Sequence, residues 1–266
     1  MKYIIPLFIA AALTLVGCEK HPVTVDDDPT AKVERKILYS VNDAETRTTF
    51  DTEAEWDAML DQFCEMSKKG YEVVFYNLDP VIHNSNMKSN SKDTHTITTS
   101  SSEEIKEWMK TMEKDGLTVK ITYDKGTGTW NGIAYATAPA NNTSNIIIGM
   151  WRLDCMVVAY LGSDDEITHA DLFEPEEDGN IMYYTFNNDG TMTLTVTIGD
   201  STYANGNSTW SLSNDGVLST DLLPSGGNWN VNWITNSTLI LSHRVNDTPD
   251  GDLIYQLQFE AVTTKK

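Results

Sequence analysis

Residues able to do chemistry are few and widely spread along the 266-residue chain. The sequence has five histidines and three cysteines, and none of them falls in the spacing of a zinc site. Catalytic elbows of the Gly-x-Ser-x-Gly type, His-Glu-x-x-His pairs, P-loops and dinucleotide fingerprints are all absent from the sequence. These absences argue against an enzyme and a bound cofactor, and favour a protein that works by binding.

Carboxylates are the one abundant chemical group. The chain has 39 acidic and 19 basic residues, a formal net charge of -20, and most of the excess falls after residue 146. A field of this sign repels phosphate backbones, so nucleic acid is not an expected partner. The acidic segment 163–179 has oxygen ligands of the kind that Ca²⁺ prefers, but it lacks the ordered spacing of a calcium loop. A solvated loop is the simpler interpretation.

The reactive group with the most informative position is the thiol of Cys18. It follows Lys2 and an apolar run from Tyr3 to Val16. A run of about 14 residues is too short to cross a bilayer as a helix and has the form of a secretory signal. The segment Leu15-Val16-Gly17-Cys18 resembles the lipobox of bacterial lipoproteins, which implies cleavage before Cys18 and acyl chains on it. The alternative is an ordinary signal peptide with an incidental cysteine.

Acyl chains on Cys18 would attach the protein to a membrane, because stable anchoring takes two lipid signals and lipoproteins of this type carry them. Residues 18–33 are acidic, contain prolines and have little to bury, so they are predicted to form a solvated tether. This tether resembles those of surface-displayed Bacteroidetes lipoproteins. The expected location is the cell envelope, lipid-anchored in the outer membrane, facing either the periplasm or the cell surface.

The chain that remains after cleavage is long enough for two domains, each with its own core. Its other cysteines, Cys64 and Cys155, fall one in each half and are both flanked by apolar residues. Free cysteines are among the most buried residue types, so two buried thiols are expected. A disulfide between the domains is the alternative in an oxidising envelope.

Residues 34–137 have the pattern of an α+β domain. Two capping boxes, Thr52-Glu53-Ala54-Glu55 and Ser101-Ser102-Glu103-Glu104, each precede an apolar stripe of helical period. Alternating strands are expected around these helices at residues 37–41, 71–75, 94–99, 117–123 and 129–137. The order is that of the ferredoxin-like, split β-α-β fold, with both helices on one face of the sheet. Residues 138–145 are predicted to be a linker.

In residues 146–264 helical periodicity largely disappears, and apolar and polar residues alternate instead in the runs 191–198, 229–233 and 253–261. Tight hairpins are indicated by four Asp-Gly pairs, namely Asp178-Gly179, Asp189-Gly190, Asp215-Gly216 and Asp250-Gly251. About eight strands joined in sequence predict an up-and-down antiparallel sheet, and closure into a barrel removes its edges.

Four segments of this half resemble lipocalins, in the order Gly149-Met150-Trp151-Arg152-Leu153, Tyr184 to Thr191, Ser208 to Leu212 and Ser237 to Leu241. The first carries the Gly-x-Trp signature, and the series is similar to the lipocalin-like domains of Bacteroidetes lipoproteins. The resemblance implies an eight-stranded antiparallel barrel without catalytic residues. It also implies that Trp151 lies at the closed end beneath a basic side chain, for which Arg244 is the candidate by position.

A barrel of eight strands is just wide enough to be filled by side chains or to hold one small ligand. The sequence leaves both interpretations open for its candidate lining residues, Trp210, Trp229, Trp233, Tyr255 and Phe259. The first hypothesis is a lipid-anchored binding protein for a small apolar or glycan-derived ligand. The alternative is a structural or protein-interaction lipoprotein with a solid barrel, whose partner is another envelope protein.

Overall fold

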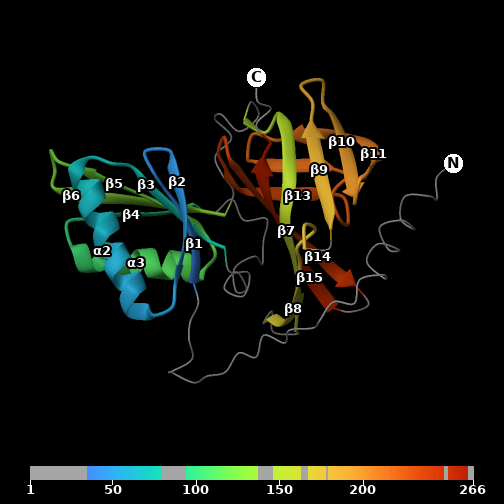
Figure 1. Ribbon diagram of the computed structural model, residues 1–266. Coiled ribbons are helices and arrows are strands. Elements are labelled where there is room, and N and C mark those ends of the chain that lie inside the picture. Colours follow the sequence, from blue (N-terminus) through green and yellow to red (C-terminus); the bar gives the residue numbers. More distant parts are fainter. Residues whose placement is uncertain are drawn as a thin grey trace. The chain divides into compact units, whose positions relative to one another are not determined.

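The computed structural model describes residues 35–78, 94–136, 146–162, 167–177, 179–248 and 251–262. The chain divides into two compact units, one with two helices on a six-stranded sheet and one with a nine-stranded sheet (Figure 1). The leader, Cys18, the tether and the predicted linker at residues 138–145 lie outside the described residues. Within the described ranges, neither helix has the length and apolar character needed to span a membrane.

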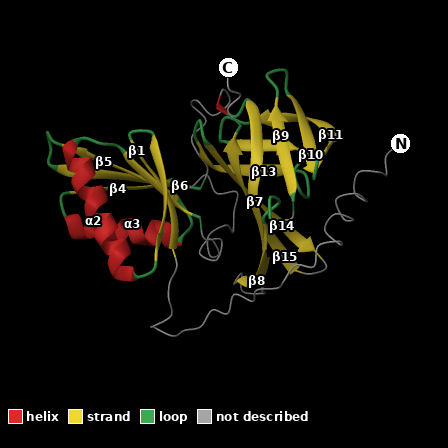
Figure 2. Cartoon of the chain, in the orientation of Figure 1, coloured by secondary structure: helices red, strands yellow, loops and turns green. Residues whose placement is uncertain are grey.

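The first unit is an α+β structure, with both helices on one face of an antiparallel sheet (Figure 2). Its elements are β1 (Arg35–Val41), β2 (Ala44–Phe50), α2 (Glu53–Lys69), β3 (Val73–Asn77), β4 (His95–Thr99), α3 (Ser102–Lys114), β5 (Thr118–Asp124) and β6 (Thr129–Tyr135). The sheet order is β2-β1-β3-β5-β6-β4. Each helix therefore joins two parallel strands with a third strand between them, which is consistent with the predicted ferredoxin-like fold.

The strand β2 is absent from the sequence prediction. It pairs with β1 at the edge of the sheet, and its residues Ala-Glu-Thr-Arg-Thr-Thr-Phe are mostly exposed, so no apolar alternation marks it. The turn before it offers the missing signal. Asn42 and Asp43 both have positive φ, 48° and 66°, as the central residues of a type I′ hairpin turn require.

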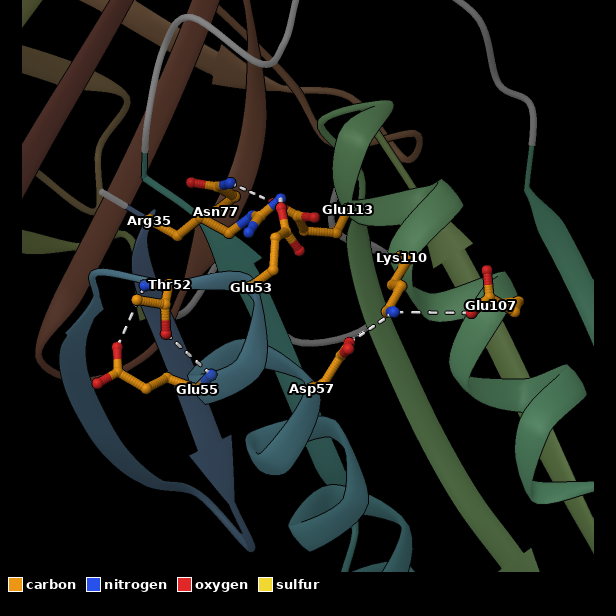
Figure 3. Close-up of polar contacts among 9 residues, drawn as sticks. All are labelled: Arg35, Thr52, Glu53, Glu55, Asp57, Asn77, Glu107, Lys110 and Glu113. Carbon is orange, nitrogen blue, oxygen red and sulfur yellow. Dashed lines mark hydrogen bonds and ion pairs between the residues drawn. The ribbon is translucent and has the colours of Figure 1, made fainter. Parts of the chain in front are cut away.

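Local sequence explains both helices. Thr52 accepts a hydrogen bond from the Glu55 backbone N–H, and the Glu55 side chain accepts one from the Thr52 backbone, completing the predicted capping box (Figure 3). The helix α2 ends at Gly70, whose φ of 100° suits a residue without a Cβ. The second capping box is incomplete. The Ser101 hydroxyl accepts a hydrogen bond from the Glu104 backbone N–H and so caps α3, but the Glu104 carboxylate accepts a hydrogen bond from the Thr99 hydroxyl instead of from the Ser101 backbone.

An ionic cluster, buried except for Glu53, joins four elements at one end of this unit (Figure 3). The Arg35 guanidinium at the start of β1 lies 2.5 Å from the Glu53 carboxylate on α2 and 3.5 Å from the Glu113 carboxylate on α3. Asn77 at the end of β3 donates to Glu113, which is fully buried. Burial raises the pKa of Glu113, and Arg35 and Asn77 oppose that rise.

The second unit is a closed antiparallel barrel of eight strands with one additional strand. Its elements are β7 (Gly149–Leu161), β8 (Ile167–Phe173), β9 (Asn180–Phe186), β10 (Thr191–Ile198), β11 (Ser201–Leu212), β12 (Val217–Thr220), β13 (Asn228–Ile234), β14 (Thr238–Thr248) and β15 (Gly251–Ala261). The order runs from β15 down to β9, then β7, and β15 pairs with β7 to close the ring. The predicted fold class is confirmed.

The strand β8 corrects the interpretation of residues 163–179 as one acidic loop. Residues Ile167–Phe173 form a strand beside β7, outside the eight that close the barrel. The acidic residues on both sides of it hid the strand in the sequence, because its own alternation, Ile-Thr-His-Ala-Asp-Leu-Phe, is weak. The interpretation of the flanking acidic residues as solvated loops stays a prediction, since several of them lie outside the described residues.

The two described cysteines differ in burial. Cys64 on α2 is buried, as expected, whereas Cys155 on β7 is only half-buried, and the alternative of a disulfide between the two units stays a prediction. Burial raises the pKa of Cys64 to about 11, which keeps the thiol protonated and unreactive at neutral pH.

Candidate functional site

The interior face of the barrel is identified by contacts between strands that are not neighbours. The rings of Tyr184 on β9 and Phe259 on β15 meet edge to face at 5.5 Å, although β7 lies between these strands. The Thr220 hydroxyl on β12 lies 3.4 Å from the Met192 sulfur on β10. Side chains of separated strands meet on the concave side of a curved sheet, so the face that carries these residues is the interior.

One half of the interior is packed solid. We call the end where β7 begins and β15 ends the closed end. Most residues facing inward there are buried, and six of them have zero exposure, namely Met192, Val231, Leu239, Leu241, Leu257 and Phe259. A void that admits water would leave accessible surface on the side chains that line it. These six side chains therefore border no void large enough for water, as expected of a packed core.

Trp151 lies at this closed end, as the Gly-x-Trp resemblance implies. Its side chain is 2% exposed, stands opposite Tyr184 and Ala261 in the neighbouring strands, and donates from Nε1 to the Ile147 carbonyl at 2.8 Å. The indole N–H is thus satisfied without a ligand.

The other half is open. Six inward-facing residues on three adjacent strands are only half-buried, and we call this group the mouth: Val158 and Tyr160 on β7, His243 and Val245 on β14, and Leu253 and Tyr255 on β15. The register aligns them, because Tyr255 stands opposite both Val158 and His243, and Leu253 opposite both Tyr160 and Val245. These side chains lie on one face of the sheet and present it to solvent.

Trp229 forms the floor of the mouth. It is fully buried at the start of β13, its ring centroid lies 5.1 Å from that of His243 and 6.3 Å from that of Tyr255, and Nε1 donates to the Gly226 carbonyl. Burial lowers the pKa of His243 below its usual value of 6.5, which keeps this imidazole neutral at pH 7. The floor and the wall beside it are therefore aromatic and uncharged.

The additional strand β8 adds polar groups next to the mouth. The His169 ring stacks on Tyr160 with centroids 5.4 Å apart, and its Nε2 lies 2.8 Å from an Asp171 oxygen. The Tyr160 hydroxyl donates to the other Asp171 oxygen at 3.2 Å. One carboxylate thus fixes both rings, and its side chain remains 30% exposed.

Four of the five predicted lining residues face the interior, at different depths. Tyr255 lies in the mouth, Trp229 forms its floor, and Phe259 is part of the packed closed half. Trp210 is a fourth interior residue but lies near the β9–β10 turn, where its ring packs on Phe186 and its Nε1 donates to the Asn187 carbonyl at 3.0 Å. Only Tyr255 is both inward-facing and accessible to a ligand in the mouth.

Trp233 is on the other face of the sheet, which corrects its assignment as an interior residue. A bulge lies between Val231 and Trp233 in the pairing of β13 with β14, so that Val231 stands opposite Leu241 and Trp233 opposite Ile240. One inserted residue reverses the facing of everything beyond it. The alternation in the sequence continues across the bulge and cannot reveal it.

Arg244 does not cover Trp151. It stands opposite Ile254 on β15, whereas Trp151 stands opposite Ala261, seven residues or about 23 Å along the strand. Arg244 also lies on the outer face, where it pairs with Asp252 at 2.7 Å. The prediction rested on position in sequence alone and is wrong, because β14 carries Arg244 toward the opposite end of the barrel from Trp151.

A further hollow lies on the outside of the barrel near its closed end. It has a volume of about 280 Å³ and is lined by Arg152, Tyr183, Glu260, Ala261 and Val262. Arg152 is already paired there with Glu260 at 2.7 Å and with Glu176 at 2.8 Å. Among the described residues, no three histidine, cysteine or carboxylate side chains are placed to hold a metal ion.

Comparison with known proteins shows what the barrel is similar to. The model of the lipocalin-like domain family matches residues 147–241. The barrel is lipocalin-like. The chain is also similar to two solved structures. One is a deswapped triple mutant of bovine odorant-binding protein, at 12% identity (TM-score 0.27, 46% of this chain and 77% of that one). The other is a protein of unknown function of the DUF3598 family from Nostoc punctiforme, at 9% identity (TM-score 0.28, 86% of this chain and 94% of that one). No curated protein matches the chain.

Proposed function

We propose that this protein is a non-catalytic binding protein whose lipocalin-like domain holds a small ligand in the mouth of the barrel. The observation that carries the proposal is the contrast along β15, where Phe259 and Leu257 are fully buried while Tyr255 and Leu253 on the same face are half-exposed. A packed closed half and an open aromatic half suit a ligand that rests on Tyr255 and His243, which cover Trp229, and not one threaded deep into the barrel. Ligand sites of this kind are concave and mostly apolar, with a few polar groups.

The proposal includes an anchor at the amino terminus. The leader and the lipobox-like segment ending at Cys18 support acylation of that cysteine and attachment to the outer membrane of a bacterial cell envelope. Mass spectrometry of the natively purified protein tests this part separately. We expect an amino-terminal peptide that begins at Cys18 and carries acyl chains. An intact leader, or cleavage at another residue, would contradict it.

A structural or protein-interaction role is the second candidate. It is favoured by the packed closed half and by two exposed apolar side chains near the tip of the β10–β11 hairpin, Ile198 at 55% and Tyr203 at 52%. In that case the mouth would bind no small molecule. Titration with a small apolar probe separates the two candidates.

The test uses N-phenylnaphthylamine, an uncharged probe whose fluorescence rises in apolar sites. We expect saturable binding to the purified protein and roughly tenfold weaker binding to Tyr255→Ala, a loss of about 1.4 kcal/mol. The matched control is Tyr183→Ala, because Tyr183 is also half-buried but lies on the outer face and lines the external hollow. Weaker binding to the Tyr183 variant alone would move the site to that hollow, and the absence of binding would favour the second candidate.

A further inference from the structure

We propose that the mouth selects ligands by charge: it accepts uncharged and positively charged ring compounds and rejects carboxylates and other anions. This inference rests on the proposed function, since it concerns the ligand class of the same site. It follows from where the few basic side chains of the second unit lie and from what faces the mouth in their place.

Among the described residues of this unit, no guanidinium or ammonium group faces the mouth. Between residues 146 and 262 the sequence has 17 acidic residues and two basic ones, Arg152 and Arg244. Both stand on the outer face, Arg152 opposite Tyr183 and Glu260, and Arg244 opposite Ile254. Both are also paired with carboxylates, at 2.7 Å in each case.

The two histidines near the mouth do not replace them. His243 is held neutral at pH 7 by burial against Trp229. His169 is bound to Asp171, so any positive charge on its ring is compensated by that carboxylate. An anionic ligand would lose its hydration in the mouth without gaining a counter-charge, and an uncompensated buried charge is strongly unfavourable.

The groups that do face the mouth favour the opposite charge. The rings of Tyr160 and Tyr255 are half-exposed there, and a cation over the face of an aromatic ring gains roughly 0.5–2 kcal/mol. The Asp171 carboxylate lies beside Tyr160 and is partly exposed. The excess of acidic residues in this unit adds a negative potential that attracts cations.

The experiment compares three competitors with the same ring and different charge: naphthalenemethanol, naphthoate and naphthylmethyltrimethylammonium, each displacing bound N-phenylnaphthylamine from the purified protein at pH 7. We expect the alcohol and the ammonium compound to displace the probe at similar concentrations, and naphthoate to need at least roughly tenfold more. Displacement by naphthoate as effective as by the alcohol would overturn the charge selection and leave the binding function standing. Failure of the probe itself to bind would overturn both.

A variant that adds a positive charge to the mouth provides a second test. Val245→Lys places an ammonium group in the mouth, and Val245→Met is its uncharged control of similar length. We expect the lysine variant, and not the methionine one, to bind naphthoate roughly tenfold more tightly than the parent protein does. Equal naphthoate affinity in both variants would contradict the inference, because a missing counter-charge would then not be what excludes the anion.

Discussion

The two units treat their aromatic and charged residues in opposite ways. In the first, the rings of Trp56, Phe63 and Phe75 are fully buried beneath two helices, with centroids 5.4 to 6.3 Å apart. In the second, the interior rings continue from the buried Phe259 out to the half-exposed Tyr255. The first arrangement completes a core, whereas the second leaves apolar surface available to a ligand.

Charged side chains show the opposite pattern, since the first unit buries them and the second keeps them outside its interior. The first unit buries an ionic cluster in which Arg35 is 4% exposed and Glu113 is fully buried, and this cluster ties both helices to the sheet. The second unit keeps Arg152 and Arg244 on its outer face. This difference supports the proposal that the ligand binds to the barrel and not to the first unit.

The largest expected effect concerns the hydrophobic core of the first unit. Trp56→Ala removes the ring that contacts Phe50, Phe63 and Phe75, and should lower the free energy of unfolding of the first unit by about 3–5 kcal/mol. Urea denaturation followed by circular dichroism measures this loss. Probe binding at the mouth should not change. The control is Tyr71→Ala, whose side chain is 43% exposed and should cost about 0.5 kcal/mol or less.

The next effect concerns the ionic cluster. Arg35→Met leaves Glu113 buried without its partner and should destabilise the first unit by about 3 kcal/mol. The double variant Arg35→Met with Glu113→Leu should recover most of that loss, because two apolar side chains then replace the pair. Additive losses in a urea titration of the double variant would show that Arg35 acts through packing and not through charge.

Two smaller effects test the boundary between the packed half of the barrel and the mouth. Leu257→Ala empties part of the packed half and should lower the stability of the second unit by about 2–3 kcal/mol, with probe affinity nearly unchanged. Leu253→Ala, four residues earlier on the same face, should lower stability by less than about 1 kcal/mol but weaken probe binding roughly threefold. The reverse pattern would place the ligand in the closed half.

The smallest expected effect is a pH dependence of the stability of the second unit that arises from His243 in the mouth. Because burial holds the pKa of His243 below 6.5, the unfolded chain takes up this proton before the folded one does. The stability contribution is therefore complete above pH 6.5 and declines as the pH falls through the lowered pKa. Thermal unfolding of the second unit should show a smaller decline between pH 7 and 5 in His243→Phe than in the parent. An identical decline in both would assign it to other groups.

Much of this fold follows from local sequence signals. The helices were predictable because Thr52 and Ser101 cap them and apolar residues recur at helical spacing. The barrel strands were predictable because apolar and polar residues alternate between Asp-Gly turns. The strands β2 and β8 were not, since an exposed edge strand and a short strand between acidic residues carry no such alternation.

The site was predictable only in part, because it depends on pairing between distant strands. Tyr255 was indicated by alternation, but the sequence could not separate it in depth from Phe259. The bulge before Trp233 has no marker in residue type. Val158, Tyr160 and His243 were missed. The run on β7 is apolar at successive positions and shows no alternation, and the facing of a residue emerges only from the register with β15.

The most direct test of the central claim is a methyl NMR titration with N-phenylnaphthylamine. Valine and leucine methyl groups sample both halves of the interior: Val158, Val245 and Leu253 in the mouth, and Val231, Leu241 and Leu257 in the packed half. We expect the probe to shift the first three resonances and to leave the second three in place. Shifts confined to the second three, or to methyl groups of the first unit, would contradict the account.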